Sequence, residues 1–292
     1  MFGRDRVAVT GASGHLGGAV LRLLREEHGV PARRLVALVR DPTKAPAGAT
    51  ARAFDYDQPD AQAKALRGVR TLFVVSTWDF DRRVAQHEAI LGAARAAGVR
   101  HVVYASSVSP GEDDHLTGAH PATERLLRES GLGWTALRAT LYMSLFDADV
   151  RAAARAGSFV TSLGKARTAL IDRWDLARAD AAVLADPAAH EGQVYAITGP
   201  TAVGAEDFAA AAASLRGRPV EVRTLSRAAC AKALAARGLS ARDIDVTLGL
   251  EDKMRSGLMS KVSPDLDRLV GDAGSSFADT MRRRLQPNGE AR

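Results

Sequence analysis

The sequence predicts an α/β protein in which a parallel β-sheet is covered on both faces by helices. Short apolar runs of strand length alternate with segments of helical period, and this alternation is typical of such sheets. Hydrophobic residues make up 46% of the chain and charged residues 25%, so we expect a soluble globular protein. A chain of 292 residues can bury a large core, and one main domain with a smaller lobe is the expected organisation.

Three glycines at a spacing of three join the first predicted strand, Val7–Val9, to the helix that follows it. Gly11 permits a tight turn, Gly14 lets a pyrophosphate approach the backbone, and Gly17 lets the helix pack closely on the sheet. The start of that helix offers free N–H groups and a positive dipole end to an anion. This order predicts a site for nucleotide phosphates, the alternative being an ordinary glycine turn. Its candidate residues are Gly11, Ser13, Gly14, His15, Leu16 and Gly17.

The other strands of the predicted sheet follow in order, with a helix or a turn between neighbours. The strands are expected at 35–39, 51–54, 69–75, 102–105 and 134–137, and the helices at 61–66, 81–97 and 122–128. Ligands of parallel sheets bind at the carboxyl ends of the strands. We therefore expect one ligand-binding edge formed by the strand exits at Gly11, Arg40, Asp55, Ser76 and Ser106.

The second half of the chain has a more mixed pattern. Helices are predicted at 141–156, 175–185, 206–215, 227–236, 244–254 and 277–285, strands at 168–171, 194–197 and 220–222, and a loose tail at 286–292. We interpret 1–138 as a cofactor-binding domain and 139–292 as mainly a substrate-binding lobe. The strands near 168–171 and 193–197 are expected to return to the main sheet.

The residue that follows the second strand selects the cofactor in such folds. An acid there binds the ribose of NAD, whereas an arginine accommodates the extra phosphate of NADP. Here the position holds Arg40, with Lys44 close behind, and Asp41 comes one residue later, where its side chain can be turned away. We therefore favour NADP(H), the alternative being that Arg40 only marks the edge of a turn.

Polar residues at two more strand exits are candidate cofactor contacts. Asp55, with Tyr56 beside it, is placed to accept a hydrogen bond from the adenine amino group, the alternative being a surface loop acid. Ser76 and Thr77 are expected to contact the ribose or the pyrophosphate.

The formal net charge of +6 and the pI of about 9.8 raise the question of nucleic acid. The arginines are scattered among acids, however, and the only dense basic run is Arg282–Arg284, without interleaved aromatic residues. We therefore expect a solvated surface, which also suits a phosphate-rich small ligand.

No apolar run approaches the ~20 residues of a membrane span, and the first residues lack the apolar core of a signal peptide. A single cysteine, Cys230, excludes an intramolecular disulfide and fits a reducing cytoplasm. We predict no metal site, because the acids and the one imidazole near the fourth and fifth strands lack the spacing of a metal cage. These residues are Asp79, Asp81, Glu112, Asp113, Asp114 and His115.

Several of these segments together resemble the short-chain dehydrogenase/reductase superfamily, and most closely its atypical NmrA-like branch with the type 2 NAD(P)H:quinone oxidoreductases. The resemblance covers about the first two hundred residues and rests on the segments 10–17, 39–42, 96–107, 120–124, 130–135 and 191–195, with Arg138. It implies a Rossmann-like doubly wound parallel sheet with a small C-terminal α/β substrate lobe that closes over the nicotinamide. It also implies an NADPH-dependent oxidoreductase.

One departure from the superfamily narrows the chemistry. Its main branch uses a Tyr-x-x-x-Lys pair, and aligned on Glu124 those positions hold Leu116 and His120. Leucine has no proton to donate, which argues against sugar epimerases and simple alcohol dehydrogenases. The quinone oxidoreductase type also lacks the pair and has a histidine at the matching place. A quinone or another flat conjugated carbonyl needs less acid assistance than a plain ketone.

Four residues are candidates for assisting or positioning the substrate. Ser106 or Ser107 can hydrogen-bond a carbonyl oxygen, or satisfy the backbone at a strand end. His120 can donate or orient a water molecule, or have no role. Tyr142 is expected to face the cleft and stack on a flat substrate, or to pack in the core.

Two functions from different classes fit these features. The first is an NADPH-dependent reductase of a small aromatic or quinone-like substrate, with a ketoreductase of aromatic natural-product biosynthesis as a special case. The second is a non-catalytic NADP(H)-binding redox sensor of the NmrA type. Either is expected as a monomer or homodimer.

Overall fold

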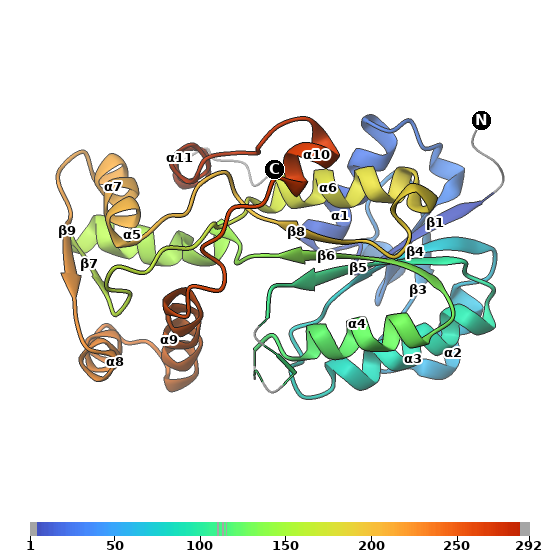
Figure 1. The fold of residues 1–292 in the computed structure, drawn as a ribbon, viewed down its shortest axis with the longest axis horizontal. Coiled ribbons are helices and arrows are strands. Elements are labelled where there is room, and N and C mark those ends of the chain that lie inside the picture. The colour runs from blue at the N-terminus through green and yellow to red at the C-terminus, as the bar shows by residue number, and fades with distance from the viewer. Residues whose placement is uncertain (1–4, 110, 113, 115, 287–292) are drawn as a thin grey trace. The chain divides into compact units, whose positions relative to one another are not determined.

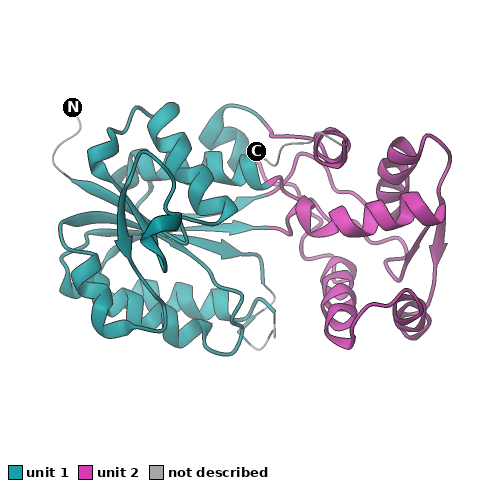
Figure 2. Ribbon diagram, turned by 180° about the vertical axis from the view of Figure 1, so that it is seen from behind, with its two compact units in different colours: residues 1–139, 173–197, 265–272 teal, residues 140–172, 198–264, 273–292 magenta. Residues whose placement is uncertain are grey.

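The computed structural model describes residues 5–109, 111–112, 114 and 116–286 (Figure 1). They form two compact units, each built from separate stretches of the chain (Figure 2). The first unit comprises residues 1–139, 173–197 and 265–272, and the second comprises 140–172, 198–264 and 273–292. The chain therefore passes from one unit to the other five times.

The first unit contains a seven-stranded sheet in the order β3-β2-β1-β4-β5-β6-β8. All neighbouring strands are parallel, which confirms the predicted doubly wound sheet. The strands are β1 (Arg6–Thr10), β2 (Leu35–Val39), β3 (Thr50–Ala53), β4 (Val69–Val75), β5 (His101–Ser107), β6 (Gly133–Ala139) and β8 (Val194–Ile197). The strand order reverses between β1 and β4, and in such sheets the ligand crevice lies at the carboxyl ends of these two strands.

Helices cover both faces of this sheet (Figure 1). The helices α1 (His15–Glu26) and α6 (Arg173–Ala185) lie on one face, and α2 (Pro59–Ala65), α3 (Arg83–Ala96) and α4 (Ala119–Glu129) on the other. The short α10 (Asp265–Val270) packs against α6. Because both faces are covered, central strands such as β2 are buried at every position.

The second unit is smaller and mainly helical. It contains α5 (Asp147–Ala156), α7 (Ala205–Arg216), α8 (Arg227–Ala236), α9 (Ala241–Arg255) and α11 (Phe277–Leu285), with the parallel strands β7 (Ser158–Thr161) and β9 (Glu221–Thr224). Aromatic side chains form much of its core, and the rings of Phe159 and Phe208 stack 5.2 Å apart.

Two elements of the second half differ from the prediction. The segment 168–171 does not join the main sheet but belongs to the second unit, where it forms only isolated bridges. Its backbone is instead hydrogen-bonded to loops, as when Ala169 N donates to Met259 O. The helix predicted at 141–156 begins only at Asp147, where two acids in the first turn favour a helix start. The predicted tail beyond Gln286 lies outside the described residues.

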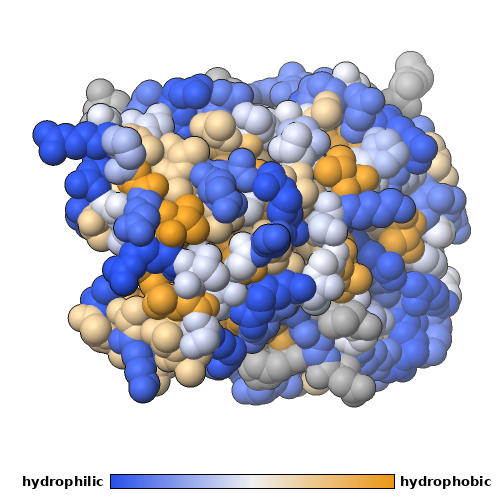
Figure 3. All heavy atoms as spheres, turned by 60° about the vertical axis from the view of Figure 1, so that its left-hand side comes forward, coloured by the Kyte–Doolittle hydropathy of each residue, from blue (hydrophilic) through white to orange (hydrophobic). Residues whose placement is uncertain are grey.

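The only dense basic run is neutralised by acids. Arg282, Arg283 and Arg284 pair with Asp279, Asp172 and Asp147 respectively. On the face drawn in Figure 3, hydrophobic side chains form small patches separated by hydrophilic ones. Across the described residues, no helix combines the length and apolar character needed to cross a membrane.

Candidate functional site

The glycine loop connects β1 to α1 at the carboxyl ends of the strands, which we call the carboxyl edge. Gly11 has a φ of +57°, a conformation that L side chains rarely adopt. A Cβ on Gly17 would lie 2.7 Å from the carbonyl oxygen of Gly11 and 3.0 Å from that of Thr10. Gly17 is therefore required for the helix to approach the loop.

The first turn of α1 is left open to an anion. Gly14 is the N-cap residue of α1, and no side chain of the described residues forms a capping hydrogen bond there. The first turn also holds no acid. The side chains of Ser13 and His15 are exposed beside it, whereas Leu16 is buried and presents only its backbone. Uncapped N–H groups at a helix start form a site for phosphate.

The exit of β2 has two cationic side chains without partners in the described chain and one carboxylate that is hydrogen-bonded within its own turn. Asp41 accepts hydrogen bonds from Thr43 N at 3.0 Å and Thr43 Oγ1 at 2.7 Å, which caps the short 3₁₀ helix Pro42–Lys44. These bonds lower the pKa of Asp41. Arg40 and Lys44 are exposed and form no hydrogen bond or ion pair with any described residue. The carboxylate therefore points into the turn while both cations remain available.

Tyr56 has a structural role at the exit of β3. Its hydroxyl lies 2.7 Å from Val75 O and 2.6 Å from Thr10 Oγ1, so it donates to an acceptor at the end of β4 or β1. Thr10 Oγ1 in turn donates to Phe73 O and accepts from Val75 N. Burial raises the pKa of Tyr56. The phenol fixes the ends of β1 and β4 rather than offering a free hydroxyl to a ligand.

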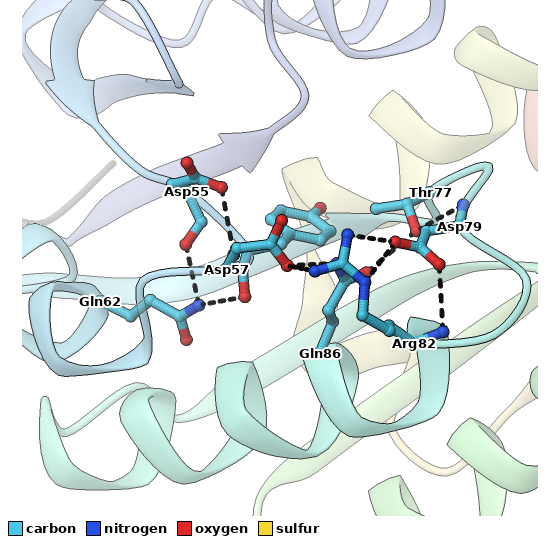
Figure 4. A network of polar contacts seen from close by, with 8 residues as sticks. Asp55, Asp57, Gln62, Thr77, Asp79, Arg82 and Gln86 are labelled. Carbon is cyan, nitrogen blue, oxygen red and sulfur yellow. Dashed lines mark hydrogen bonds and ion pairs between the residues drawn. The ribbon is translucent and has the colours of Figure 1, made fainter.

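A polar network fixes the loops after β3 and β4 (Figure 4). Arg82 donates to Asp57 at 2.9 Å and to Asp79 at 2.8 Å, and Gln86 donates to the same Asp57 oxygen at 2.8 Å. Thr77 Oγ1 donates to Gln86 Oε1 at 3.1 Å. Thr77 is therefore part of the scaffold of this edge.

Asp55 adjoins this network through its own loop. Its carboxylate accepts from Asp57 N at 3.1 Å, and its carbonyl accepts from Gln62 Nε2 at 3.0 Å (Figure 4). One carboxylate oxygen of Asp55 makes no hydrogen bond within the described chain. The adjoining strand exit places Ser76 Oγ in a buried position without a hydrogen bond of normal geometry.

Ser106 is engaged inside the fold. It is buried at the end of β5, and its hydroxyl donates to Glu124 Oε1 at 2.7 Å. Arg138 on β6 donates to both oxygens of Glu124, at 2.8 and 2.6 Å, and Arg128 donates at 3.2 Å. The Ser106 hydroxyl therefore supports the fold through a side-chain carboxylate, and not through the backbone contact considered from the sequence. The neighbouring Ser107 donates to the backbone of Val108 or Ala139.

His120 lies beneath the same edge in the first turn of α4. Its Nδ1 is 2.8 Å from the Tyr104 hydroxyl, and its Nε2 is 3.4 Å from Nη1 of Arg83. A guanidinium can only donate, so Nε2 accepts and Nδ1 donates to Tyr104. Burial raises the pKa of Tyr104 and lowers that of Arg83. Both ring nitrogens of His120 therefore have partners in the fold.

Residues that the sequence did not single out also shape this edge. Trp78, directly after Thr77, is 67% exposed, the most exposed large hydrophobic side chain of the described chain. Its ring meets that of Phe80 edge-on at 6.0 Å, and the Arg83 guanidinium lies 4.8 Å from the Phe80 ring centre. An exposed aromatic residue at a ligand-binding edge carries no sequence period, which is why pattern analysis missed it.

The predicted cofactor residues share the carboxyl edge of the first unit, whereas Tyr142 belongs to the second unit, where its backbone bridges Ile171. Within the described residues, no group of three or more His, Cys, Asp or Glu side chains is arranged to hold a metal ion. Asp113 and His115, named in the metal prediction, lie outside the described residues.

Known proteins are similar to this chain in both sequence and fold. A family model described as NAD(P)H-binding matches residues 11–187. Quinone oxidoreductase 2 of Escherichia coli (strain K12) is 33% identical over 287 residues, which cover 97% of this chain and 99% of that protein.

Two solved structures extend the comparison. The crystal structure of the Escherichia coli NADPH-dependent quinone oxidoreductase in complex with NADPH has a TM-score of 0.88 at 33% identity, over 96% of this chain and 100% of that chain. The Citrobacter sp. triphenylmethane reductase has a TM-score of 0.87 at 31% identity, over 96% and 99%. The resemblance inferred from the sequence is thereby confirmed. The chain belongs to the NAD(P)H-binding family, together with reductases such as quinone oxidoreductase 2 of Escherichia coli.

Proposed function

We propose that this protein transfers hydride from NADPH to a small, flat, electron-poor aromatic substrate of the quinone type. The observation that carries the cofactor choice is the exit of β2, where Arg40 and Lys44 are unpaired and Asp41 caps its own turn. A guanidinium and an ammonium attract the extra phosphate of NADPH, and a carboxylate facing the ribose would repel it.

The residues at the carboxyl edge fit such a cofactor. The open first turn of α1, with Gly14 and the N–H groups after it, would hold the pyrophosphate. Arg40 and Lys44 would hold the ribose phosphate. Asp55 has an oxygen to spare for the adenine amino group, and the Ser76 hydroxyl makes no hydrogen bond of normal geometry within the described chain. When bound, the nicotinamide supplies the hydride.

The residues around the edge favour an acceptor that needs little acid assistance. The position that usually holds the catalytic tyrosine holds Leu116. The Ser106 hydroxyl is bound to Glu124. The two ring nitrogens of His120 are bound to Tyr104 and Arg83. Hydride addition to a quinone gives a stabilised phenolate, whereas hydride addition to a plain ketone gives a strongly basic alkoxide. The exposed ring of Trp78 offers a flat surface on which such a substrate can be oriented.

Cofactor selection is tested by binding. We expect Arg40→Ala to weaken NADPH binding by about tenfold or more, in line with the loss of one charge-assisted contact, and to leave NADH binding nearly unchanged. Arg33→Ala is the matched control, because Arg33 is also exposed and unpaired but precedes β2 instead of following it. Titration calorimetry measures both cofactors, and equal losses for NADPH and NADH would contradict the proposed phosphate site.

Catalysis is tested with a panel of quinones, a cationic triarylmethane dye and a plain ketone, following the absorbance of the reduced nicotinamide. We expect turnover of the electron-poor acceptors and none of the plain ketone. A ketoreductase of aromatic natural-product biosynthesis would instead prefer a carbonyl flanked by a phenol, which can take its proton internally.

The engaged Ser106 and His120 side chains also suit a second candidate function, a redox sensor that binds NADP(H) without turning it over. Tight NADPH binding with no oxidation by any acceptor of the panel would favour this sensor over the reductase.

A further inference from the structure

The second unit contains a cavity of about 210 Å³ that has no part in the proposed cofactor site. Its walls come from α5, β7, α8 and α9 and from the segments next to them. Apolar side chains make up most of the lining, among them Phe146, Phe159, Leu234 and Leu250. A dry cavity of about 150 Å³ accepts benzene, so this one has room for an aromatic ring with a short arm.

One carboxylate in this lining has no partner. Asp149, in the first turn of α5, makes no hydrogen bond or ion pair with any described residue. A second acid of the cavity, the buried Glu251, is satisfied, because its two oxygens accept from Thr161 Oγ1, Ser162 N and Ser162 Oγ. Only Asp149 therefore has full capacity for a ligand.

The charges around the cavity favour a cation. Asp149, Asp243 and Glu251 contribute three carboxylates to the lining, and Arg242 contributes the one guanidinium. Asp243 accepts from Ser240 Oγ at 2.6 Å in the cap of α9, and the exposed Arg242 forms no ion pair in the described chain. An anion entering this lining would be repelled by the unpaired Asp149, whereas a cation would gain a partner.

We propose that this cavity binds a small monocationic amine. Its ammonium pairs with Asp149, and its aryl or alkyl body lies between the phenylalanine and leucine walls. The proposal does not rest on the proposed reductase activity, because every residue that carries it belongs to the second unit.

The charge of the ligand provides the first test. We use 2-phenylethylamine, 2-phenylethanol and phenylacetate as cationic, neutral and anionic probes of one shape, and measure binding to the full chain by NMR at pH 8. We expect the amine to bind about tenfold tighter than the alcohol, and phenylacetate to bind more weakly than either. Equal affinity for the amine and the alcohol, or no binding of the amine at millimolar concentration, would overturn the proposal.

The second test changes the carboxylate. Asp149→Asn is expected to reduce the affinity for the amine to that for the alcohol, whereas Asp245→Asn, an exposed acid on α9 outside the lining, leaves both unchanged. Leu250→Phe, which fills the cavity, is expected to abolish binding of all probes. Amine affinity unchanged in Asp149→Asn would show that the ammonium binds elsewhere.

A pH series on the unmodified protein tests the same pairing without any substitution. Burial raises the pKa of Asp149 to about 6, with Arg237 opposing this effect and Glu251 adding to it, while the Cys230 thiol, with a pKa of about 11, stays neutral. The affinity for the amine should therefore fall as the pH drops from 7 to 5, while that for the alcohol stays level. Parallel curves for both probes would contradict the pairing.

Discussion

At the scale of single residues, the direction of one carboxylate decides how a cofactor meets the exit of β2. Asp41 directly follows Arg40, so the sequence alone leaves either residue available to the ribose. The two hydrogen bonds from Thr43 hold the carboxylate in the 3₁₀ turn. Because the turn satisfies the acid locally, we expect the guanidinium of Arg40 and the ammonium of Lys44, and not the carboxylate of Asp41, to select between NADPH and NADH.

Trp78 is expected to contribute to substrate binding and not to cofactor binding. In Trp78→Ala the Michaelis constant for a quinone should rise by about tenfold, the value of a lost aromatic contact, with the NADPH dissociation constant changed little. Steady-state kinetics and cofactor titration measure the two constants. Trp78→Phe serves as the control, since it keeps a ring and should retain most of the affinity.

The buried Asp180 is expected to lower stability at neutral pH. It lies on α6 with no exposed surface, and neither of its carboxylate oxygens has a hydrogen-bond partner among the residues that the structure describes. Burial raises the pKa of Asp180 well above its usual value. The folded state therefore binds the proton more tightly than the unfolded state, and this carboxyl destabilises the fold increasingly as the pH rises above about 4.

Removing this acid should stabilise the protein. Asp180→Leu is expected to raise the free energy of unfolding at pH 7 by about 1–3 kcal/mol, the cost of a buried polar group without a partner. Denaturant unfolding at pH 4 and pH 7 tests this, because the gain should be smaller at pH 4. The neutral variant Asp180→Asn separates the effect of the charge from that of the polar group. An equal gain in unfolding free energy for Asp180→Leu at both pH values would contradict the raised pKa of Asp180.

At the scale of elements, the approach of α1 to the glycine loop depends on the absence of a side chain at Gly17. Gly17→Ala places a methyl group 2.7 Å from the Gly11 carbonyl oxygen, so we expect a loss of about 1–3 kcal/mol in stability and weaker NADPH binding. Gly92→Ala in α3 is the control, because a Cβ there meets nothing within 4 Å. Thermal unfolding should show that this control gains about 1 kcal/mol.

The helix α4 is fastened to the sheet through the buried carboxylate of Glu124. Arg138 makes two short hydrogen bonds to it, and Arg128 makes a single longer one. We expect Arg138→Ala, which removes two short hydrogen bonds, to cost about 2 kcal/mol of unfolding free energy, and Arg128→Ala, which removes one longer bond, to cost less than about 1 kcal/mol. Chemical denaturation compares them, and equal losses would show that the two arginines support Glu124 alike.

The elements that the sequence predicts well are those with long apolar patterns. The run in β2 is buried at every position and that in β4 at most positions, and the amphipathic stripe of α1 is equally plain. The four-residue β7 and the six-residue α10 are too short to show a period, so neither was predicted.

The site was predictable where its chemistry is local and missed where it depends on distant partners. The strand–turn pattern around them predicts the turn conformation of Gly11 and the position of Arg40 directly after β2. The sequence leaves Ser106 open between a substrate contact and a backbone contact, because Glu124, its acceptor, lies 18 residues further along the chain. Arg83 resembles any solvated helix charge in the sequence, yet only 3% of it is exposed, since burial depends on which helices pack together.

At the scale of the whole molecule, the first unit is completed by stretches from the second half of the chain. The fragment 1–139 would lack α6, which packs beside α1, and β8, which pairs with β6. We expect this fragment to aggregate or to lack cooperative unfolding, whereas the full chain unfolds cooperatively. Circular dichroism during heating tests this, and a sharp transition of the soluble fragment would contradict it.

The five passages of the chain between the units also limit how such a protein can diversify. No single recombination event can replace the second unit, because every stretch of it except the last is flanked on both sides by sequence belonging to the first. We therefore expect the second unit to change by point substitutions and loop insertions more readily than by exchange of one contiguous segment. Laboratory evolution of this scaffold should accordingly favour scattered mutagenesis over the exchange of whole modules.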